Sequence, residues 1–301
     1  MFSADLRDER FTGCFTAIIT PFSEDGAAID YGRLKAQIDR QAAGNVRGIV
    51  VSGTTGESPT LSPSEYRELV QAAVRFGHEA NLLVIAGTGS NSTAHAVESQ
   101  RFAHEAGADG ALSVNPYYNK PEQEGLYRHF MTIADAADLP IVLYNIPGRT
   151  GVALTPATVE RLFAHPNIVA NKEATGSTDS ATEMLARCPG LSLLSGDDAM
   201  TLPFLSIGGA GVVSVVSNLA PDRMSALVGA WLTGDTERAR ELHYELFDLC
   251  RTMFCETNPV PVKTAMNLLG HDTGALRLPM TPPRDETVER VRQAIGRLDI
   301  K

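Results

Sequence analysis

Eight short apolar runs, separated by stretches with helical patterns, constrain the fold of this chain more than any other feature. Each run is almost continuously apolar, which is typical of strands covered on both faces, as in a parallel sheet. The runs are residues 14–20, 48–53, 82–87, 110–115, 141–146, 168–172, 191–196 and 211–217. Eight such units predict a closed (β/α)₈ barrel, or TIM barrel, rather than an open doubly wound sheet. No G-x-G-x-x-G turn follows the first run, which also argues against a dinucleotide-binding fold.

The intervening stretches carry helix start signals, and the end of the chain is predicted to be helical only. Residues 62–65 (SPSE) form a capping box with proline at the first helical position, and Thr155-Pro156 repeats the cap and proline. After residue 220 the strand-like runs stop, and apolar residues return at helical spacing. They are Met224, Leu227, Val228, Trp231, Leu242, Leu246 and Leu249. We therefore predict a catalytic barrel over residues 1–220 and a C-terminal helical region over 221–301.

Composition excludes several classes of protein. The net charge of −10 over 301 residues argues against nucleic acid or an anionic membrane surface as a partner. No apolar run is long enough for a spanning helix, and the start, MFSADLRDERF, lacks the apolar region of a signal peptide. Four cysteines without C-x-x-C spacing are expected to be reduced and buried, which predicts a cytoplasmic protein. The seven histidines show no paired-ligand spacing, so no catalytic metal is expected.

Polar residues follow the ends of the predicted strands, where a barrel of this kind carries its catalytic groups. The segments are GTTGES (53–58), GTGSN (87–91), NPYYNK (115–120), YNIPGRTG (144–151), KEATG (172–176) and GDD (196–198). Loops face water, which explains any one of these segments by itself. It explains less well why basic groups, tyrosines and a Thr-Thr pair should arrive together on one rim.

Lys172 ends the predicted strand IVANK, and a lysine at the end of a buried strand must either extend to water or have a function. Side chains alternate along a strand, so Ile168, Ala170 and Lys172 share one face. If the small Ala170 faces the barrel interior, Lys172 also points inward, loses solvation and favours its neutral amine. A neutral amine can attack a carbonyl and form a Schiff base. The alternative is a lysine that extends to water or pairs with Glu173, and this segment by itself leaves both open.

Two other segments suggest anion binding. GTTGES lacks the lysine of an ATP-binding loop, but it offers successive backbone N–H groups and two hydroxyls for a carboxylate or phosphate. Arg149, in IPGRTG, suits a bidentate bond to a carboxylate if it faces the pocket. As a surface loop arginine it would have no such role.

GTTGES, PYYNKPEQEGLY, YNIPGRTG and KEATG, in this order and spacing, resemble the dihydrodipicolinate synthase family within the N-acetylneuraminate lyase superfamily. The resemblance extends from about Phe11 to the segment NPVPVKTAMNLLG at 258–270. It implies a (β/α)₈ barrel with a C-terminal helical extension. It also implies condensation of pyruvate with L-aspartate 4-semialdehyde in the route to diaminopimelate and lysine, with no cofactor besides a covalent imine.

The resemblance also assigns roles to individual residues. Lys172 matches the lysine that forms the imine, Tyr144 the acid/base tyrosine, and Thr54 and Tyr118 the rest of its proton relay. The substrate-binding positions are Thr55 for the pyruvate carboxylate, Arg149 for the semialdehyde carboxylate, and Gly196 and Val213 for the pocket lining. The tyrosine that matches Tyr118 reaches into a neighbouring subunit's site, which implies a homodimer at least and commonly a homotetramer.

Some residues depart from the family pattern. Asn171 stands where an aliphatic residue is usual; on the alternation above it faces the helices, so its amide needs a buried partner. At a lysine-binding site known in some members, Asn91 and Tyr117 match, but His95 replaces an acid and Pro63 and Tyr66 also differ. We therefore expect weak or absent inhibition by L-lysine.

Two alternatives remain open. The first is a sister aldolase acting on N-acetylneuraminate or a 2-keto-3-deoxy sugar acid, which would share Lys172 and Tyr144 but usually lacks the arginine at the position of Arg149. The second is a paralogue that binds a keto acid without turnover. Retention of Lys172, Tyr144, Thr54 and Tyr118 together argues against it.

Overall fold

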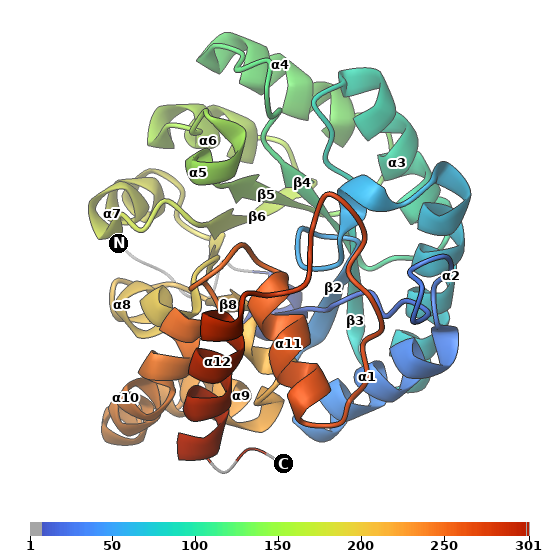
Figure 1. Ribbon diagram of the computed structural model, residues 1–301. Coiled ribbons are helices and arrows are strands. Elements are labelled where there is room, and N and C mark those ends of the chain that lie inside the picture. The colour runs from blue at the N-terminus through green and yellow to red at the C-terminus, as the bar shows by residue number, and fades with distance from the viewer. Residues whose placement is uncertain (1–7, 299, 301) are drawn as a thin grey trace. The chain divides into compact units, whose positions relative to one another are not determined.

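Eight parallel strands form one closed barrel in the computed structural model, which describes residues 8–298 and 300 (Figure 1). The strands follow one another around the barrel in chain order, as predicted. They are β1 (Gly13–Ala17), β2 (Gly48–Val51), β3 (Leu83–Gly87), β4 (Gly110–Val114), β5 (Ile141–Asn145), β6 (Ile168–Glu173), β7 (Ser192–Ser195) and β8 (Gly211–Ser214). The predicted (β/α)₈ fold is therefore confirmed.

Helices alternate with the strands and then continue without them, in line with the predicted helical extension. The helices are α1 (Tyr31–Ala43), α2 (Pro63–Glu79), α3 (Thr93–Glu105), α4 (Gln123–Ala134), α5 (Pro147–Thr150), α6 (Pro156–Phe163), α7 (Thr178–Arg187), α8 (Thr201–Ser206), α9 (Pro221–Leu232), α10 (Thr236–Thr252), α11 (Val260–Leu268) and α12 (Asp285–Arg297). The predicted capping box is present at α2, and Thr155 caps α6 through its side chain. Short 3₁₀ turns include η3 (Ser58–Thr60) and η5 (Val216–Asn218).

The first and last strands are shorter than predicted. Residues 18–20 and 215–217 are apolar or buried, but they leave the strand pattern. The Asn218 side chain explains the end of β1, because its Nδ2 donates to the carbonyl of Ala17 and its Oδ1 accepts from the N–H of Ile19. A side chain thus satisfies backbone groups that a longer strand would have paired, and the peptide chain can turn there without an unpaired polar group.

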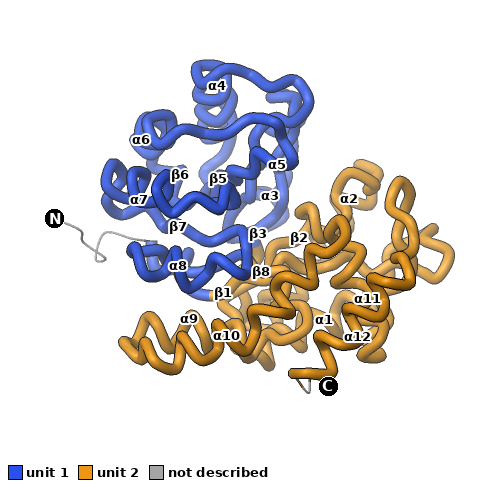
Figure 2. Tube along the Cα trace, turned by 60° about the vertical axis from the view of Figure 1, so that its left-hand side comes forward, with its two compact units in different colours: residues 1–13, 85–213 blue, residues 14–84, 214–301 orange. Residues whose placement is uncertain are grey.

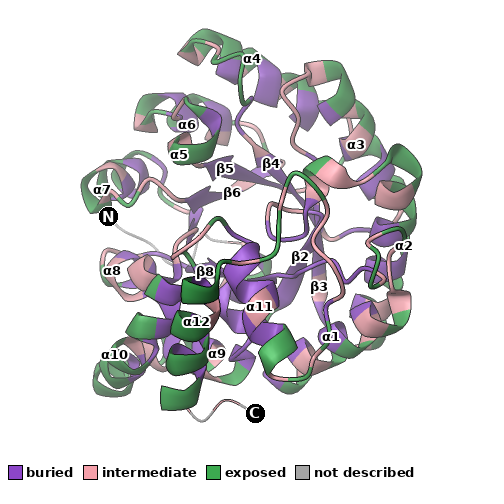
Figure 3. Cartoon of the chain, in the orientation of Figure 1, coloured by how far each residue is buried: buried purple, intermediate pink, exposed green. Residues whose placement is uncertain are grey.

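The chain divides into two compact units, which we describe separately (Figure 2). Unit 1 contains Ile85–Val213 and the described N-terminal residues 8–13. Within it, β4 pairs with β5, β5 with β6, β6 with β7, and β7 with β8. Its core lies between these strands and the helices outside them, and includes Phe130, Leu143, Leu162, Met184 and Phe204. The strands of unit 1 are largely buried (Figure 3).

Unit 2 joins the segment Cys14–Val84 to the segment Ser214–Lys301. In it α9 packs against both α1 and α10, and α12 packs against α10 and α11. The apolar residues predicted to form one face of α9 and α10 are buried, apart from the partly exposed Trp231. The boundary after residue 220 stays a prediction.

Other expectations from the sequence can be checked directly. No helix among the described residues is both long and apolar enough to span a membrane. None of the cysteines forms a disulfide; Cys14, Cys188 and Cys250 are buried, whereas Cys255 is partly exposed, so the prediction of burial was wrong for that residue. The absence of a signal peptide was predicted from the first eleven residues. Residues 1–7 of that segment lie outside the residues that the structure describes.

Candidate active site

Lys172 and Tyr144 lie side by side at the ends of two neighbouring strands of unit 1. The parallel register of β5 and β6 pairs Tyr144 with Lys172. Both side chains are almost fully buried, with 5% of Lys172 and 6% of Tyr144 exposed. The Lys172 Nζ lies 4.1 Å from the centroid of the Tyr144 ring. The inward orientation that strand alternation predicted for Lys172 therefore places its amine against an aromatic ring rather than in water.

Lys172 has no acid to neutralise it among the residues that the structure describes. Its one polar contact there is the Tyr144 ring. The alternative of a pair with Glu173 is not seen, and with 5% exposure the side chain does not extend to water. Within the described part of the chain, Lys172 is therefore neither a surface lysine nor a partner in a buried ion pair, which leaves its amine available for another role.

A second buried lysine, Lys263 in unit 2, shows the contrasting case. Its Nζ donates to the Glu57 carboxylate at 2.8 Å and to the carbonyls of Ala275 at 2.8 Å and Thr20 at 3.3 Å. Burial lowers the pKa of Lys263, an effect opposed by the Glu57 carboxylate. All three protons of the Lys263 ammonium are engaged, whereas Lys172 Nζ makes no hydrogen bond with a described residue.

The structure gives the Asn171 amide nitrogen buried partners, whereas its Oδ1 is buried without a hydrogen-bond partner among the described residues. Its Nδ2 donates to Glu173 Oε2 at 3.1 Å and lies 3.3 Å from the sulfur of Met184 in α7. Asn171 therefore faces the helices, as alternation predicted. Asn145 Nδ2 donates to the same carboxylate oxygen at 3.0 Å, and the N–H of Thr175 donates to the other oxygen at 2.8 Å. The fully buried Glu173 carboxylate is thus held by three donors on the side of β6 opposite to Lys172.

Gly196 lies directly against the lysine. It follows β7, and its N–H donates to the carbonyl of Glu173 at 2.8 Å. A Cβ at this position would come within 2.7 Å of the Ala174 Cβ and 3.2 Å of the Lys172 Cε. Any side chain at position 196 would therefore come into close contact with the side chain of Lys172.

The other predicted residues of unit 1 lie in different surroundings. Val213 is buried in β8, and Arg149 lies on the exposed side of the short helix α5, five residues after Tyr144. Tyr118 is 90% exposed and has a left-handed backbone with φ of 74°. An exposed ring cannot pack against the buried pair of its own chain, so the structure does not bring Tyr118 together with Lys172 and Tyr144.

Thr54 and Thr55 belong to the turn that follows β2 in unit 2. Thr55 is 2% exposed, and its Oγ1 accepts a hydrogen bond from Asn258 Nδ2 at 3.0 Å. The next residues are fixed as well: Thr20 Oγ1 donates to the carbonyl of Gly56 at 2.7 Å, and Glu57 is left-handed with φ of 54°. Hydrogen bonds to other segments of unit 2 therefore hold this turn in place.

Several polar residues that support these sites were not predicted from the sequence to do so: Asn115, Asn145 and Asn258 were not singled out, and Glu173 was considered only as a partner of Lys172. Asn115 Nδ2 donates to Asn145 Oδ1 at 3.2 Å, which extends the network around Glu173. A polar residue inside an otherwise apolar strand, such as Asn145 in IVLYN, is the signal that could have found this network. No such signal marks Asn258.

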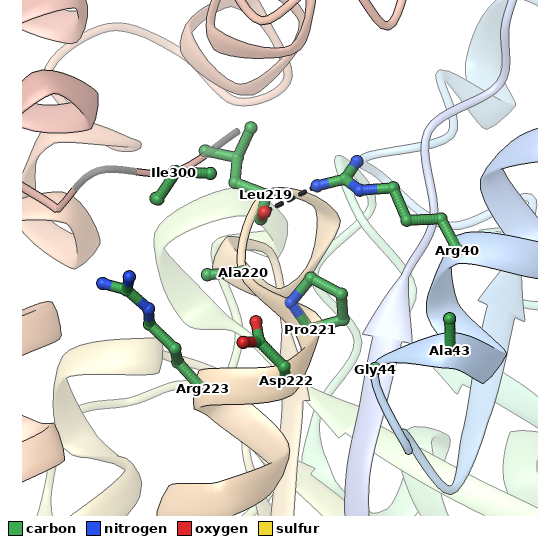
Figure 4. Close-up of a pocket in the computed structure, with 9 residues that line it drawn as sticks. All are labelled: Arg40, Ala43, Gly44, Leu219, Ala220, Pro221, Asp222, Arg223 and Ile300. Carbon is green, nitrogen blue, oxygen red and sulfur yellow. Dashed lines mark hydrogen bonds between the residues drawn. The ribbon is translucent and has the colours of Figure 1, made fainter.

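A cavity of about 280 Å³ lies elsewhere in unit 2, between the C-terminal end of α1 and the N-terminal end of α9 (Figure 4). The Arg40 guanidinium points across it to the carbonyl of Leu219, at 2.5 Å. None of the predicted site residues lines this cavity. Because α1 leads into the beginning of β2, the cavity lies away from the strand ends where the chemistry was predicted. Among the described residues, no group of histidine, cysteine and acidic side chains could hold a metal ion.

Comparison with known proteins identifies the family. The model of the dihydrodipicolinate synthetase family matches residues 10–298. The chain belongs to this family. A 4-hydroxy-tetrahydrodipicolinate synthase of Methanococcoides burtonii is 51% identical over 274 residues, which cover 90% of this chain and 93% of that protein. The family predicted from the sequence is therefore confirmed.

Solved structures of the dihydrodipicolinate synthase family agree with the fold. The enzyme of Cyanidioschyzon merolae, with lysine bound, has a TM-score of 0.95 and 41% identity, and covers 98% of this chain and 100% of that one. The chloride-inhibited enzyme of Acinetobacter baumannii, in complex with pyruvate, has a TM-score of 0.94 and 39% identity, and covers 97% of this chain and 100% of that one.

Proposed function

We propose that this chain is a 4-hydroxy-tetrahydrodipicolinate synthase that condenses pyruvate with L-aspartate 4-semialdehyde through a Schiff base on Lys172. Membership of the family and relatives of that name at about half identity support the activity. The observation that carries the mechanism is the buried amine of Lys172, which lies 4.1 Å from the Tyr144 ring and has no acid beside it among the described residues.

The proposed steps begin at the Lys172 amine. Lys172 Nζ adds to the ketone of pyruvate, and loss of water leaves a protonated imine. The imine withdraws electrons, so a methyl proton leaves and an enamine forms, which attacks the aldehyde carbon. The amine of the semialdehyde then displaces Lys172 and closes the ring. Proton transfers accompany several of these steps, and we assign them to Tyr144. The covalent imine replaces a separate cofactor.

The remaining residues receive their proposed roles from the family resemblance. Thr54 and Tyr118 complete the proton relay with Tyr144, Thr55 binds the pyruvate carboxylate, and Arg149 binds the carboxylate of the semialdehyde. Gly196 and Val213 line the pocket.

We also propose a homodimer or a homotetramer, in which Tyr118 serves the site of a second copy of the chain. The exposed ring of Tyr118, held by a left-handed backbone, supports this arrangement. The acidic net charge and the absence of C-x-x-C spacing support a cytoplasmic enzyme with no nucleic-acid or membrane partner.

Trapping with borohydride tests the proposal. Incubation with pyruvate and borohydride should add the reduced pyruvate group to Lys172, and peptide mapping can distinguish it from Lys35, Lys120, Lys263 and Lys301. Turnover is then compared between L-aspartate 4-semialdehyde and sugar aldehydes. An adduct on another lysine would refute the mechanism. Faster turnover of a sugar aldehyde would instead identify a sister aldolase with the same mechanism.

Substitution of Tyr144 by phenylalanine separates the ring from the hydroxyl. The ring remains against Lys172 Nζ, and no described residue bonds to the hydroxyl, so the melting temperature should change little. Loss of general acid–base catalysis should lower kcat by about 10²–10⁴-fold. Stopped-flow turnover and calorimetry measure both effects. Tyr127→Phe is the matched control, because that ring packs on Arg161 instead. Equal loss in both variants would rule out a specific role for the Tyr144 hydroxyl.

Inhibition by L-lysine is expected to be weak or absent. A ligand ammonium would find an exposed His95 where lysine-sensitive members carry an acid. Steady-state turnover measured at rising L-lysine concentrations checks this expectation. His95→Glu is the informative variant, since a restored carboxylate should increase the inhibition. Strong inhibition of the unaltered chain at micromolar lysine would contradict the prediction.

A further inference from the structure

The hydrogen bond between Asn258 and Thr55 joins two buried side chains that lie far apart in the sequence. Thr55 is in the turn after β2, and Asn258 precedes α11; they are 2% and 5% exposed. The donor is Asn258 Nδ2 and the acceptor is Thr55 Oγ1, at 3.0 Å. Both residues belong to unit 2.

This bond determines how Thr55 can use its hydroxyl. A threonine hydroxyl can donate one hydrogen bond and accept others, and it rotates to suit its neighbours. Because the lone pairs of Thr55 Oγ1 face the Asn258 amide, its proton points elsewhere. No described residue accepts that proton. The buried hydroxyl is therefore left as a donor, and a negatively charged oxygen is the strongest acceptor for it.

The backbone of the same turn leaves further donors without partners. The N–H groups of Gly56 and Glu57 bond back to the carbonyls of Gly53 and Thr54. The N–H groups of Thr54 and Thr55 donate to no residue that the structure describes. Successive unpaired N–H groups beside a hydroxyl that is free to donate are the groups with which a turn binds an anion.

The turn is fixed on its other side by buried ions. The Glu57 carboxylate accepts from Lys263 Nζ at 2.8 Å and from the N–H of Arg277 at 3.0 Å. Thus α11 contributes Lys263, which anchors the turn, and the residue shortly before α11, Asn258, directs the hydroxyl of Thr55.

We propose that Asn258 is a positioning residue for pyruvate: by donating to Thr55 Oγ1, it turns the Thr55 hydroxyl into a hydrogen-bond donor toward the pyruvate carboxylate. The inference rests on the proposed function, in which Thr55 binds that carboxylate. Asn258 acts through Thr55 and takes no part in the proton transfers. Its loss should therefore weaken pyruvate binding and leave the rate at saturation almost unchanged.

Two substitutions of Asn258 test this role. Asn258→Ala removes the donor. Asn258→Asp keeps the shape but offers an acceptor, so the Thr55 proton should turn toward the aspartate and away from the substrate. We expect the KM for pyruvate to rise about tenfold in the first variant and more in the second, while kcat stays within about twofold. The pyruvate concentration that gives half-maximal borohydride trapping on Lys172 should shift equally.

A double-mutant cycle separates this role from simple support of the fold. Thr55→Val should raise the pyruvate KM by itself, and Asn258→Ala should add nothing further in that background, because the hydroxyl it directs is gone. The matched control is Asn267→Ala in α11, which removes the Oδ1 that accepts from the N–H and the hydroxyl of Thr273 and should leave the pyruvate KM unchanged. Thermal melts of every variant report folding.

The outcomes distinguish the two proposals. If the unaltered enzyme forms no adduct on Lys172, the proposed function is wrong. If that adduct forms but Asn258→Ala leaves the pyruvate KM unchanged, or adds fully to Thr55→Val, the positioning role is wrong and the proposed function stands.

Discussion

Replacing Lys172 with methionine is expected to abolish the trapped pyruvate adduct and to lower turnover by roughly a thousandfold or more. Methionine fills a similar volume but has no amine, so neither the imine nor the enamine can form. The protein should remain at least as stable as before, because no carboxylate in the described part of the chain pairs with Lys172 and would be left unpaired. Mass spectrometry, steady-state kinetics and thermal melting measure the three effects.

Lys35→Met provides the control for this experiment. Lys35 is partly exposed and pairs with Asp39, four residues on in α1. Its loss should leave turnover and the adduct unaffected, since an exposed ion pair contributes little to stability. Residual turnover of the Lys172 variant at a tenth of the normal rate would show that the reaction proceeds without an imine at this residue.

Replacing Lys263 with methionine should have the opposite result, a loss of stability. The substitution leaves the Glu57 carboxylate buried without its counter-ion, since both side chains of the pair are 2% exposed. Breaking a buried pair in this way costs about 3–5 kcal/mol of the free energy of unfolding. Denaturant unfolding followed by circular dichroism measures the loss. At temperatures where the variant is folded, borohydride should still trap pyruvate on Lys172.

The double variant Glu57→Gln with Lys263→Met checks whether the unpaired Glu57 carboxylate causes the loss of stability. Glutamine is neutral and can still accept from the N–H of Arg277, which bonds to Glu57 Oε2. Removing both charges should recover most of the stability, because a buried pair replaced as a whole is often neutral or stabilising. A double variant as unstable as Lys263→Met would mean that packing around the lysine chain, rather than the unpaired carboxylate, explains the loss.

Local patterns predicted the barrel because each strand and helix carries its own signal. The strand ends were less predictable. β1 stops at Ala17 because Asn218, about two hundred residues later, bonds to the backbone around it, and no local pattern reveals that contact.

The residues of the candidate site also differ in how far the sequence could predict their contacts. Alternation along β6 placed Lys172 and Asn171 on opposite faces, and the structure agrees. The same rule places Glu173 on the face of Asn171. It therefore argues against a pair between the adjacent Lys172 and Glu173, and it could have identified Glu173 as the partner of Asn171. The sequence could not predict the partner of Thr55, because Asn258 contacts it only after distant segments have folded together.

The division of the chain into two units has a consequence for its synthesis. Unit 1 is built mainly from one continuous segment, Ile85–Val213, whereas unit 2 needs both Cys14–Val84 and Ser214–Lys301. At about 5–20 residues per second, a ribosome needs on the order of ten seconds to pass from the first of these segments to the second. During that time Glu57 has been made and Lys263 has not. The segment made first thus completes its buried ion pair last, and unit 1 has the earlier opportunity to fold.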